Sequence, residues 1–296
     1  MTLEIFCPFW GDPDLLFEAV HSVRAQRNSD WRLTVIDDCY PDETIPARFA
    51  ELEDERITYV RNDTNLGITE NYRAAIRRAS SDYVTILGCD DLMHPNYVDV
   101  VLRVISEAPQ ADVVQPGVQV IDEHGAVITP LVDRVKQRLL APRTHGRTVV
   151  LTGPDMATSL IRGDWLYWPS LTFRTDTLKR IDFREGLPII QDLALLMDIA
   201  FDGGSLAYTS EVAFSYRRHG SSASQKTILD GRRFHDERVY YRAARGLALS
   251  KGWRKTARVA AARLMSRMHA LTEVPGVIRH GNGAALKSTL AHIFAG

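Results

Sequence analysis

The first 120 residues alternate between two hydrophobic patterns, and this alternation restricts the fold more than any other feature of the chain. Short apolar runs predict buried strands at residues 3–8, 31–36, 57–60, 83–87 and 113–120. Between them, apolar residues at helical spacing predict helices at residues 14–26, 43–53, 69–79 and 95–106. Strands that alternate with helices of this length form βαβ units, so we expect an α/β protein with a mainly parallel sheet.

Composition narrows the class of protein. Charged residues make up 25% of the 296 residues and the net charge is −1, which argues against a generally basic nucleic-acid binder and against an acidic disordered chain. No apolar run is long enough for a membrane-spanning helix, and the N-terminus lacks the pattern of a signal peptide. The three cysteines match neither a disulfide framework nor a zinc site, so we expect a cytoplasmic protein.

The balanced total hides a strong asymmetry of charge. From Arg232 to the end there are 13 Lys and Arg but only three acids, a net charge of +10, so residues 1–231 carry −11. Residues 234–249 and 254–271 have helical apolar spacing, with Arg on the remaining positions. Two interpretations stay open: solvated helices that pack on the acidic body, or attraction to an anionic membrane or acceptor.

Polar side chains gather where the predicted strands end. Asp37 and Asp38 follow the second strand, residues 62–67 follow the third, and Asp90 and Asp91 follow the fourth. Ligands bind parallel sheets outside the carboxyl ends of the strands. Neither a GxGxxG nor a GxxxxGK[ST] phosphate loop is present, so adjacent carboxylates suggest a divalent cation held by oxygen ligands. The alternative is that Asp90 and Asp91 only cap the turn before Pro95.

The second half of the chain is less regular. Residues 123–150, rich in Gly, Pro and basic residues, predict a long loop of the functional or mobile kind. A helix is expected at 152–161, an aromatic cluster at 163–170, a helix at 193–201 and a strand at 205–216.

Six short segments, in this order, resemble motifs of the inverting glycosyltransferases of family 2, from residue 3 to about residue 225. They are Pro8-Phe9-Trp10-Gly11; Asp37-Asp38-Cys39-Tyr40-Pro41-Asp42; Asn65-Leu66-Gly67 with Asn71; Leu87-Gly88-Cys89-Asp90-Asp91 with Pro95; Gln191-Asp192; and Tyr216-Arg217-Arg218-His219. The chain departs from the family pattern at four positions: it has Gly11 where the family has Asn, Tyr40 where it has Ser, Gly88 where it has Asp, and Gln191 where it has Glu. It lacks the Q-x-x-R-W segment of processive polymerases, which favours transfer of one or few sugars.

The resemblance implies a GT-A-like, Rossmann-type mixed sheet flanked by helices in residues 1–228. The donor half covers about 1–115 and the acceptor half about 116–228, and a basic helical extension follows at 229–296. It also implies site residues. Donor-binding residues are Pro8, Phe9, Asp38, Asn65, Asp90 and Arg218, with Arg217 as a second candidate for the phosphate. Asp38 would accept a hydrogen bond from the base, and Asp90 would support the ribose or a metal-bound water.

Further roles follow from the same resemblance. Asp91 and His219 would bind Mn²⁺ or Mg²⁺, and Asp192 would be the general base. Trp165, Trp168 and Gln191 would lie on the acceptor side. The residues alone leave structural alternatives open: helix caps for Asp38 and Asp192, a surface basic cluster for His219, and core packing for Pro8, Phe9 and the two tryptophans.

The implied activity is transfer of a sugar with inversion, from a nucleotide diphosphate, UDP above all, to a hydroxyl of a glycan, lipid-linked or small-molecule acceptor. This is the chemistry of cell-envelope glycan biosynthesis. No nucleic-acid partner is expected; a homo-oligomer, and peripheral contact of the basic region with the inner face of the membrane, are left open. The competing hypotheses are a sugar-phosphate nucleotidyltransferase, whose Gly-rich basic loop is missing here, and a catalytically idle binding module.

Overall fold

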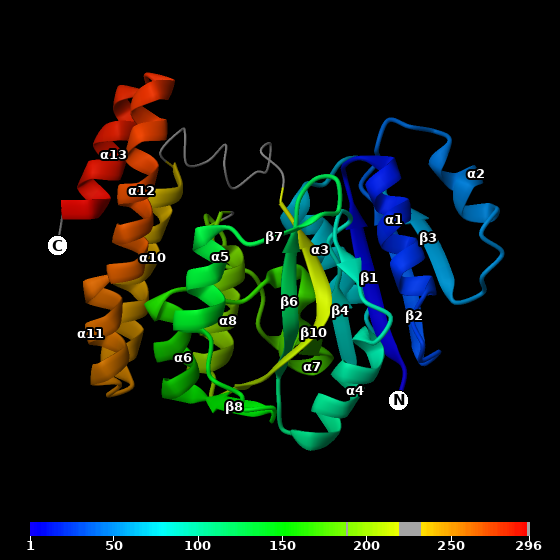
Figure 1. Ribbon diagram of the computed structural model, residues 1–296, viewed down its shortest axis with the longest axis horizontal. Helices are drawn as coiled ribbons and strands as arrows, with labels where there is room; N and C mark the ends of the chain where they lie inside the picture. Colours follow the sequence, from blue (N-terminus) through cyan, green and yellow to red (C-terminus); the bar gives the residue numbers. More distant parts are fainter. Residues whose placement is uncertain (188, 219–231, 295–296) are drawn as a thin grey trace.

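The predicted alternation folds into one mixed sheet in the computed structural model, which describes residues 1–187, 189–218 and 232–294 (Figure 1). The first four strands along the chain are β1 (Leu3–Phe9), β2 (Trp31–Asp37), β3 (Ile57–Arg61) and β4 (Tyr83–Ile86). They are parallel and lie side by side in the order β3-β2-β1-β4. All four end at the same edge, the upper one in Figure 1. The parallel arrangement confirms the sequence prediction.

Three helices connect these strands, α1 (Pro13–Arg24), α2 (Ile45–Ala50) and α3 (Ile68–Arg78), and α4 (Tyr97–Glu107) follows them. The carboxylate of Asp12 caps α1 by accepting a hydrogen bond from the amide of Asp14 at 2.9 Å. Helix α3 begins at Ile68, directly after Gly67, whose φ of 83° favours glycine. The apolar faces of α1 and α4 share a core with β1 and β2.

Antiparallel strands complete the sheet. The strand β9 (Thr172–Arg174) lies between β4 and β6 (Val113–Ile121) and runs antiparallel to both, whereas β6 pairs in parallel with β10 (Ser205–Arg217). The two-residue β5 (Leu92–Met93) pairs with the end of β10. The helices α6 (Gly153–Arg162), α7 (Thr175–Arg180) and α8 (Gln191–Phe201) accompany this half, with the short 3₁₀ turn η2 (Trp168–Ser170).

The prediction of a long irregular loop at residues 123–150 is wrong. This segment contains β7 (Val127–Ile128), α5 (Leu131–Val135), the π-helix η1 (Lys136–Leu140) and the start of β8 (Val149–Thr152). The order depends on distant partners: Gln137 Nε2 donates to the carbonyl of Val118 at 2.8 Å, and the hydroxyl of Tyr167 donates to Asp133 at 2.9 Å. Local sequence patterns do not reveal such bonds.

The described part of the basic region, residues 232–294, contains the helices α10 (Arg232–Ser250), α11 (Arg254–Ala262), α12 (Leu264–His280) and α13 (Gly283–Phe294). Arg263, with φ of 48°, breaks the single helix expected at 254–271. Tyr240 and Ala257 belong to the same hydrophobic core as α6 and α8, and α12 and α13 pack around Phe234. Among the described residues, no helix is long and apolar enough to cross a membrane.

Candidate active site

The predicted donor residues meet at the carboxyl edge of the sheet, beginning with an aromatic group after β1. The side chain of Phe9 is fully buried and packs on Tyr40 with 5.1 Å between ring centroids. Trp10, also 5.4 Å from Tyr40, is 52% exposed. Phe9 therefore matches its core-packing alternative, and Trp10 is the aromatic side chain here that offers a face to a ligand. Pro8 lies half-buried beside it.

Asp38 organises the loop that follows β3. Its Oδ1 accepts hydrogen bonds from Asn62 Nδ2 at 2.8 Å and from the amide of Leu66 at 2.9 Å, and its Oδ2 accepts from the amide of Gly67 at 2.8 Å. Asn65 Oδ1 supports the same turn by accepting from Gly67 at 3.1 Å. Asp38 is no helix cap, because α2 begins only at Ile45. A carboxylate offers about four acceptor positions, so Oδ2 retains one.

The turn after β4 carries the two predicted metal-site carboxylates. Asp91 is 1% exposed, and its Oδ1 accepts a hydrogen bond from the amide of Arg217 at 2.7 Å. Burial raises the pKa of the Asp91 carboxyl, the neighbouring Asp90 raises it further, and the bond and charge of Arg217 oppose the rise. A Cβ atom at Gly88 would lie 2.3 Å from Asp91 Oδ2. The family's aspartate at position 88 would therefore displace this carboxylate.

Arg217, which the sequence suggested only as a phosphate partner, supports the structure of the site. The side chain is 3% exposed. Its guanidinium donates to the carbonyls of Asp90 at 2.7 Å and Glu123 at 3.1 Å, and to Glu18 Oε2 at 2.6 Å. These bonds tie β10 to the carboxylate turn and leave Arg217 directed away from a phosphate role. The sequence around Arg217 does not reveal this role, because its partner Glu18 lies far away in the chain.

Arg218 is also engaged. Its Nε lies 2.8 Å from Asp133 Oδ2 and its Nη2 donates to Oδ1 of the same carboxylate at 3.0 Å. Asp133 is buried and holds Tyr167 as well. A donor phosphate would have to compete with Asp133 for this guanidinium. His219, the second predicted metal ligand, lies outside the described residues.

Asp192 lies in the first turn of α8 and is half-buried. Its Oδ1 accepts a hydrogen bond from the amide of Leu193 at 2.8 Å, and within the described ranges nothing donates to its Oδ2. The neighbouring Gln191 accepts from the hydroxyl of Thr69 at 2.7 Å. This bond engages the side-chain oxygen of Gln191 and links α3 to α8.

Tyr72, in α3, packs on Trp168 and Phe183 and was missed at the sequence level. Burial raises the pKa of its phenol, and Cys89, Asp192 and Asp90 raise that pKa further. Tyr72 is therefore within electrostatic reach of both the carboxylate turn and the start of α8. Asp164 is a second missed acid: burial raises its pKa to about 6, and the charge of Asp192 contributes to the rise. Tyr72 is part of a helical apolar pattern, and Asp164 does not follow a strand, so no sequence pattern assigned either of them to the site.

The two predicted acceptor-side tryptophans differ in burial. Trp165 is 2% exposed, lies edge-to-face on Tyr208 with 4.9 Å between centroids, and donates to Ser159 Oγ, so it packs in the hydrophobic core as its structural alternative predicts. Trp168 is partly buried and packs among Tyr72 and two phenylalanines at the margin of the core.

The carboxylate turn fits a divalent cation of the kind that binds nucleotides. In the part of the chain that the structure describes, no cluster of three or more His, Cys, Asp or Glu side chains could hold a metal ion. Mg²⁺ is usually bound through one or two carboxylates, with substrate phosphates and water completing the shell. Asp90 and Asp91 supply that pair.

Comparison with known proteins agrees with this arrangement. The family model described as Glycosyl transferase family 2 matches residues 4–158, so the chain belongs to that family. Over nearly its whole length the fold is that of GT-A glycosyltransferases. The similarity to residues 1–349 of Staphylococcus aureus TarS in complex with UDP-GlcNAc covers 99% of this chain and 82% of that fragment, with a TM-score of 0.66 and 16% identity. The similarity to a Pyrobaculum calidifontis mannosyltransferase in complex with GDP-Man and Mn²⁺ covers 98% of this chain and 85% of that one, with a TM-score of 0.61 and 14% identity.

Two curated relatives are named for the biosynthesis of colanic acid and of succinoglycan. The putative colanic acid biosynthesis glycosyl transferase WcaA of Escherichia coli is 35% identical over 34% of this chain and 36% of its own length. The succinoglycan biosynthesis protein ExoO of Rhizobium meliloti is 27% identical over 75% of this chain and 62% of its own length. The chain thus spans less than two thirds of either relative.

Proposed function

We propose that this protein transfers a sugar, with inversion, from a nucleotide diphosphate to an acceptor hydroxyl. The observation that carries the proposal is that Asp38 and the turn with Asp90 and Asp91 follow the ends of β2 and β4, the parallel strands on either side of β1, in a family 2 chain. Asp192 is added because its neighbour Gln191 bonds to Thr69 of α3, the helix that follows the Asp38-organised loop. Phosphate-loop glycines are absent from the sequence, so carboxylates and a cation would have to manage the pyrophosphate.

The donor side is assigned from the contacts of Asp38. Its remaining acceptor position on Oδ2 suits a ring N–H such as that of uracil, and the exposed face of Trp10 suits stacking on the base. We infer a UDP-sugar as the donor. The UDP-GlcNAc bound by TarS supports this choice, whereas the GDP-Man bound by the mannosyltransferase makes GDP-sugars the competitor.

The metal would be held by Asp91, with Asp90 directed to the ribose or to a metal-bound water. Bound Mn²⁺ or Mg²⁺ supplies Lewis-acid stabilisation of the leaving nucleoside diphosphate. Arg217 holds the turn in position, because its amide bonds the carboxylate of Asp91 and its guanidinium bonds the backbone carbonyl of Asp90. Arg218 can turn to the pyrophosphate only when Asp133 releases it.

Asp192 would act as the general base on the acceptor hydroxyl. One oxygen is anchored to the amide of Leu193, so the carboxylate has a defined orientation while Oδ2 can take the proton. A single displacement with a base and no protein nucleophile gives inversion. The relatives named for colanic acid and succinoglycan biosynthesis support a glycan acceptor.

The test is nucleotide release from a panel of UDP-, GDP- and TDP-sugars with Mn²⁺, Mg²⁺ or EDTA. Binding is measured in parallel by the rise in melting temperature that a ligand of the native state produces. Release of UDP that EDTA abolishes, with the anomeric configuration of the product inverted, is the expected result. Binding of a UDP-sugar without turnover for any acceptor would indicate a binding module instead.

A further inference from the structure

The C-terminal helices contain a long stretch of uniform charge. Between Glu237 and Glu273 the chain has no acidic residue and nine Lys and Arg. On α10 and α11 most of these cations are exposed, and the apolar sides of the helices face α6 and α8. The segment therefore presents an exposed, purely cationic surface.

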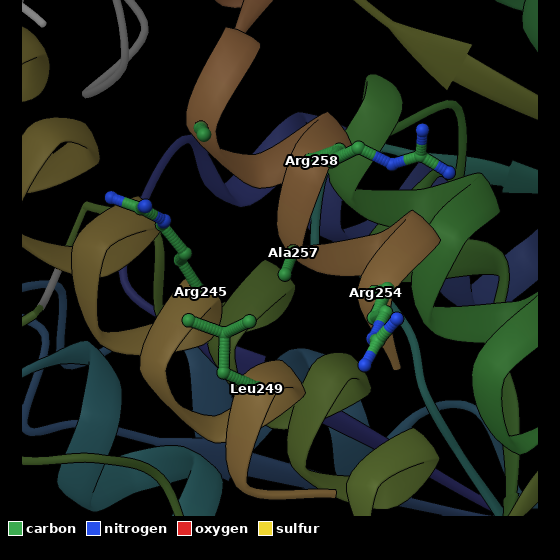
Figure 2. Close-up of a pocket in the computed structure, with 6 residues that line it drawn as sticks. Arg245, Leu249, Arg254, Ala257 and Arg258 are labelled. Carbon is green, nitrogen blue, oxygen red and sulfur yellow. The ribbon is translucent and has the colours of Figure 1, made fainter. Parts of the chain in front are cut away.

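A groove of about 510 Å³ lies on this surface, between α10 and α11. It is lined by Arg245 and Leu249 of α10 and by Arg254, Ala257, Arg258 and Ala261 of α11. Figure 2 shows the three guanidinium groups splayed outward around the apolar side chains of Leu249 and Ala257. Leu249 is 53% exposed. The floor of the groove is thus apolar and its rim is cationic.

The three arginines of the rim make no hydrogen bond or ion pair through their side chains with any residue that the structure describes. Other arginines behave differently: Arg184 pairs with Asp198 at 2.7 Å, and Arg217 pairs with Glu18 at 2.6 Å. Arginine carries five N–H donors in a planar fork that matches phosphate. Three such forks without protein partners indicate a surface arranged for an anionic partner.

The groove is remote from the donor residues. The parallel strands end at the upper edge in Figure 1, where α10 begins near Arg232, and α10 ends at the opposite edge, where it meets α11 (Figure 1). Arg254 and Leu249 lie at that opposite end. The groove is therefore neither a donor nor a pyrophosphate subsite.

We propose that the α10–α11 surface docks on a bilayer of anionic phospholipid. Its arginine rim pairs with headgroup phosphates, and Leu249 enters the interface. A bilayer is favoured over a single bound anion because the guanidiniums diverge: they can reach several phosphates of a plane but cannot converge on one. Contact with a lipid surface would place a transferase of this family beside lipid-linked acceptors.

The test is co-sedimentation of the full-length protein with phosphatidylcholine vesicles that do or do not contain phosphatidylglycerol. We expect binding only to the anionic vesicles, and its loss when salt rises from about 0.1 M to about 1 M, because the Debye length falls from about 10 Å to about 3 Å. Each basic residue near an anionic surface contributes about fivefold in affinity, so the Arg245→Gln, Arg254→Gln, Arg258→Gln triple variant should bind on the order of 100-fold more weakly.

Two further variants make the result specific. A matched control, Arg32→Gln, Arg77→Gln, Arg78→Gln, removes three exposed cations from β2 and α3 and should bind vesicles like the wild type. Leu249→Ser should weaken binding even at low salt, because it removes the inserted apolar side chain. Melting temperatures near that of the wild type show that the variants are folded.

Equal binding to neutral and anionic vesicles, or an equal loss in both triple variants, would overturn the proposal. So would a dimer in lipid-free solution that Leu249→Ser converts to a monomer, since the groove would then be a contact between subunits. Vesicle binding is measured without substrate, so its failure is distinct from failure of the proposed transferase activity.

Discussion

The donor edge and the C-terminal helices place their charges in opposite ways. At the donor edge the carboxylates are buried and bonded: Asp38 accepts three hydrogen bonds, and Asp91 is held by the amide of Arg217. On α10 and α11 most of the arginines are exposed, and those of the groove lack protein partners in the described chain.

The contrast shows two uses of charge. Buried, bonded carboxylates have fixed positions, which chemistry at a single atom requires. Exposed unpaired cations create a field, whose strength depends on their number and on salt rather than on exact placement. We therefore expect single conservative substitutions to be severe at the donor edge, and small, additive effects on the helices.

The largest effect is expected for Asp91→Asn. The amide oxygen can still accept the hydrogen bond from Arg217, so the fold should persist, but the charge that attracts a divalent cation is lost. Turnover should fall by at least about 1000-fold, since metal stabilisation of a leaving group supplies several kcal/mol. Steady-state rates with added Mn²⁺ and the melting temperature measure both. Wild-type turnover in this variant would disprove the metal role.

Asp192→Asn should lower kcat by at least about 100-fold, the usual contribution of a general base. The affinity for the nucleotide sugar should remain that of the wild type, because the assigned role is on the acceptor side. Isothermal titration with UDP-sugar and single-turnover kinetics separate the two quantities. Joint loss of binding and chemistry would instead give Asp192 a donor or structural role.

Gly88→Ala tests whether the exact placement of Asp91 matters. The added Cβ would lie 2.3 Å from Asp91 Oδ2, so the carboxylate must move. A displacement of about 1 Å at a reacting group can cost about 100-fold, and we expect a loss of up to that size. Metal dependence of the rate is the measurement. Gly11→Ala is the matched control, since its Cβ would meet only Cys89 Sγ, at an ordinary 3.5 Å.

Asp38→Asn should affect both stability and donor binding. An amide has one acceptor oxygen, so either the pair of donors on Oδ1 loses its acceptor, or the amide of Gly67 loses the shorter of its two bonds and keeps only Asn65 Oδ1. An unsatisfied buried donor costs about 1–3 kcal/mol, which urea unfolding can resolve. The KM for the nucleotide sugar should rise as well. Full stability with an unchanged KM would contradict the role of Asp38 in organising residues 62–67.

The smallest effect concerns pH and the C-terminal helices. Burial lowers the pKa of His292 to about 4, against the opposing charge of Glu237 and a hydrogen bond to the carbonyl of Phe234. The native state therefore favours neutral imidazole, and the unfolded chain binds the proton first. The stability that depends on neutral His292 is fully present above pH 6.5 and is lost as the pH falls toward 4. By about pH 5 the free energy of unfolding should have fallen by on the order of 1–2 kcal/mol.

Urea unfolding of the wild type and of His292→Gln from neutral to acidic pH measures this contribution. The variant should show a flatter dependence of its unfolding free energy on pH. Identical slopes would show that other groups dominate the acid sensitivity of this region.

Several elements could not be predicted because their stability comes from distant partners. The strand β9 has only three residues, too few for an alternating pattern, and is defined by its pairing with β4 and β6. The order of residues 123–150 depends on Asp133 and Gln137, whose partners lie elsewhere in the chain. The four parallel strands and their helices were predictable, because each buries a periodic apolar face.

The sequence by itself determined the α/β class, the family motifs and the position of the carboxylates at strand ends, since all three are encoded in local spacing. The tertiary structure alone decided what each polar side chain contacts. Arg217 and Arg218 are neighbours in the chain, yet Arg217 binds Glu18, 199 positions away, and Arg218 binds Asp133. Hydrogen-bond partners and burial depend on how distant segments pack, and periodicity along the chain carries no information about that packing.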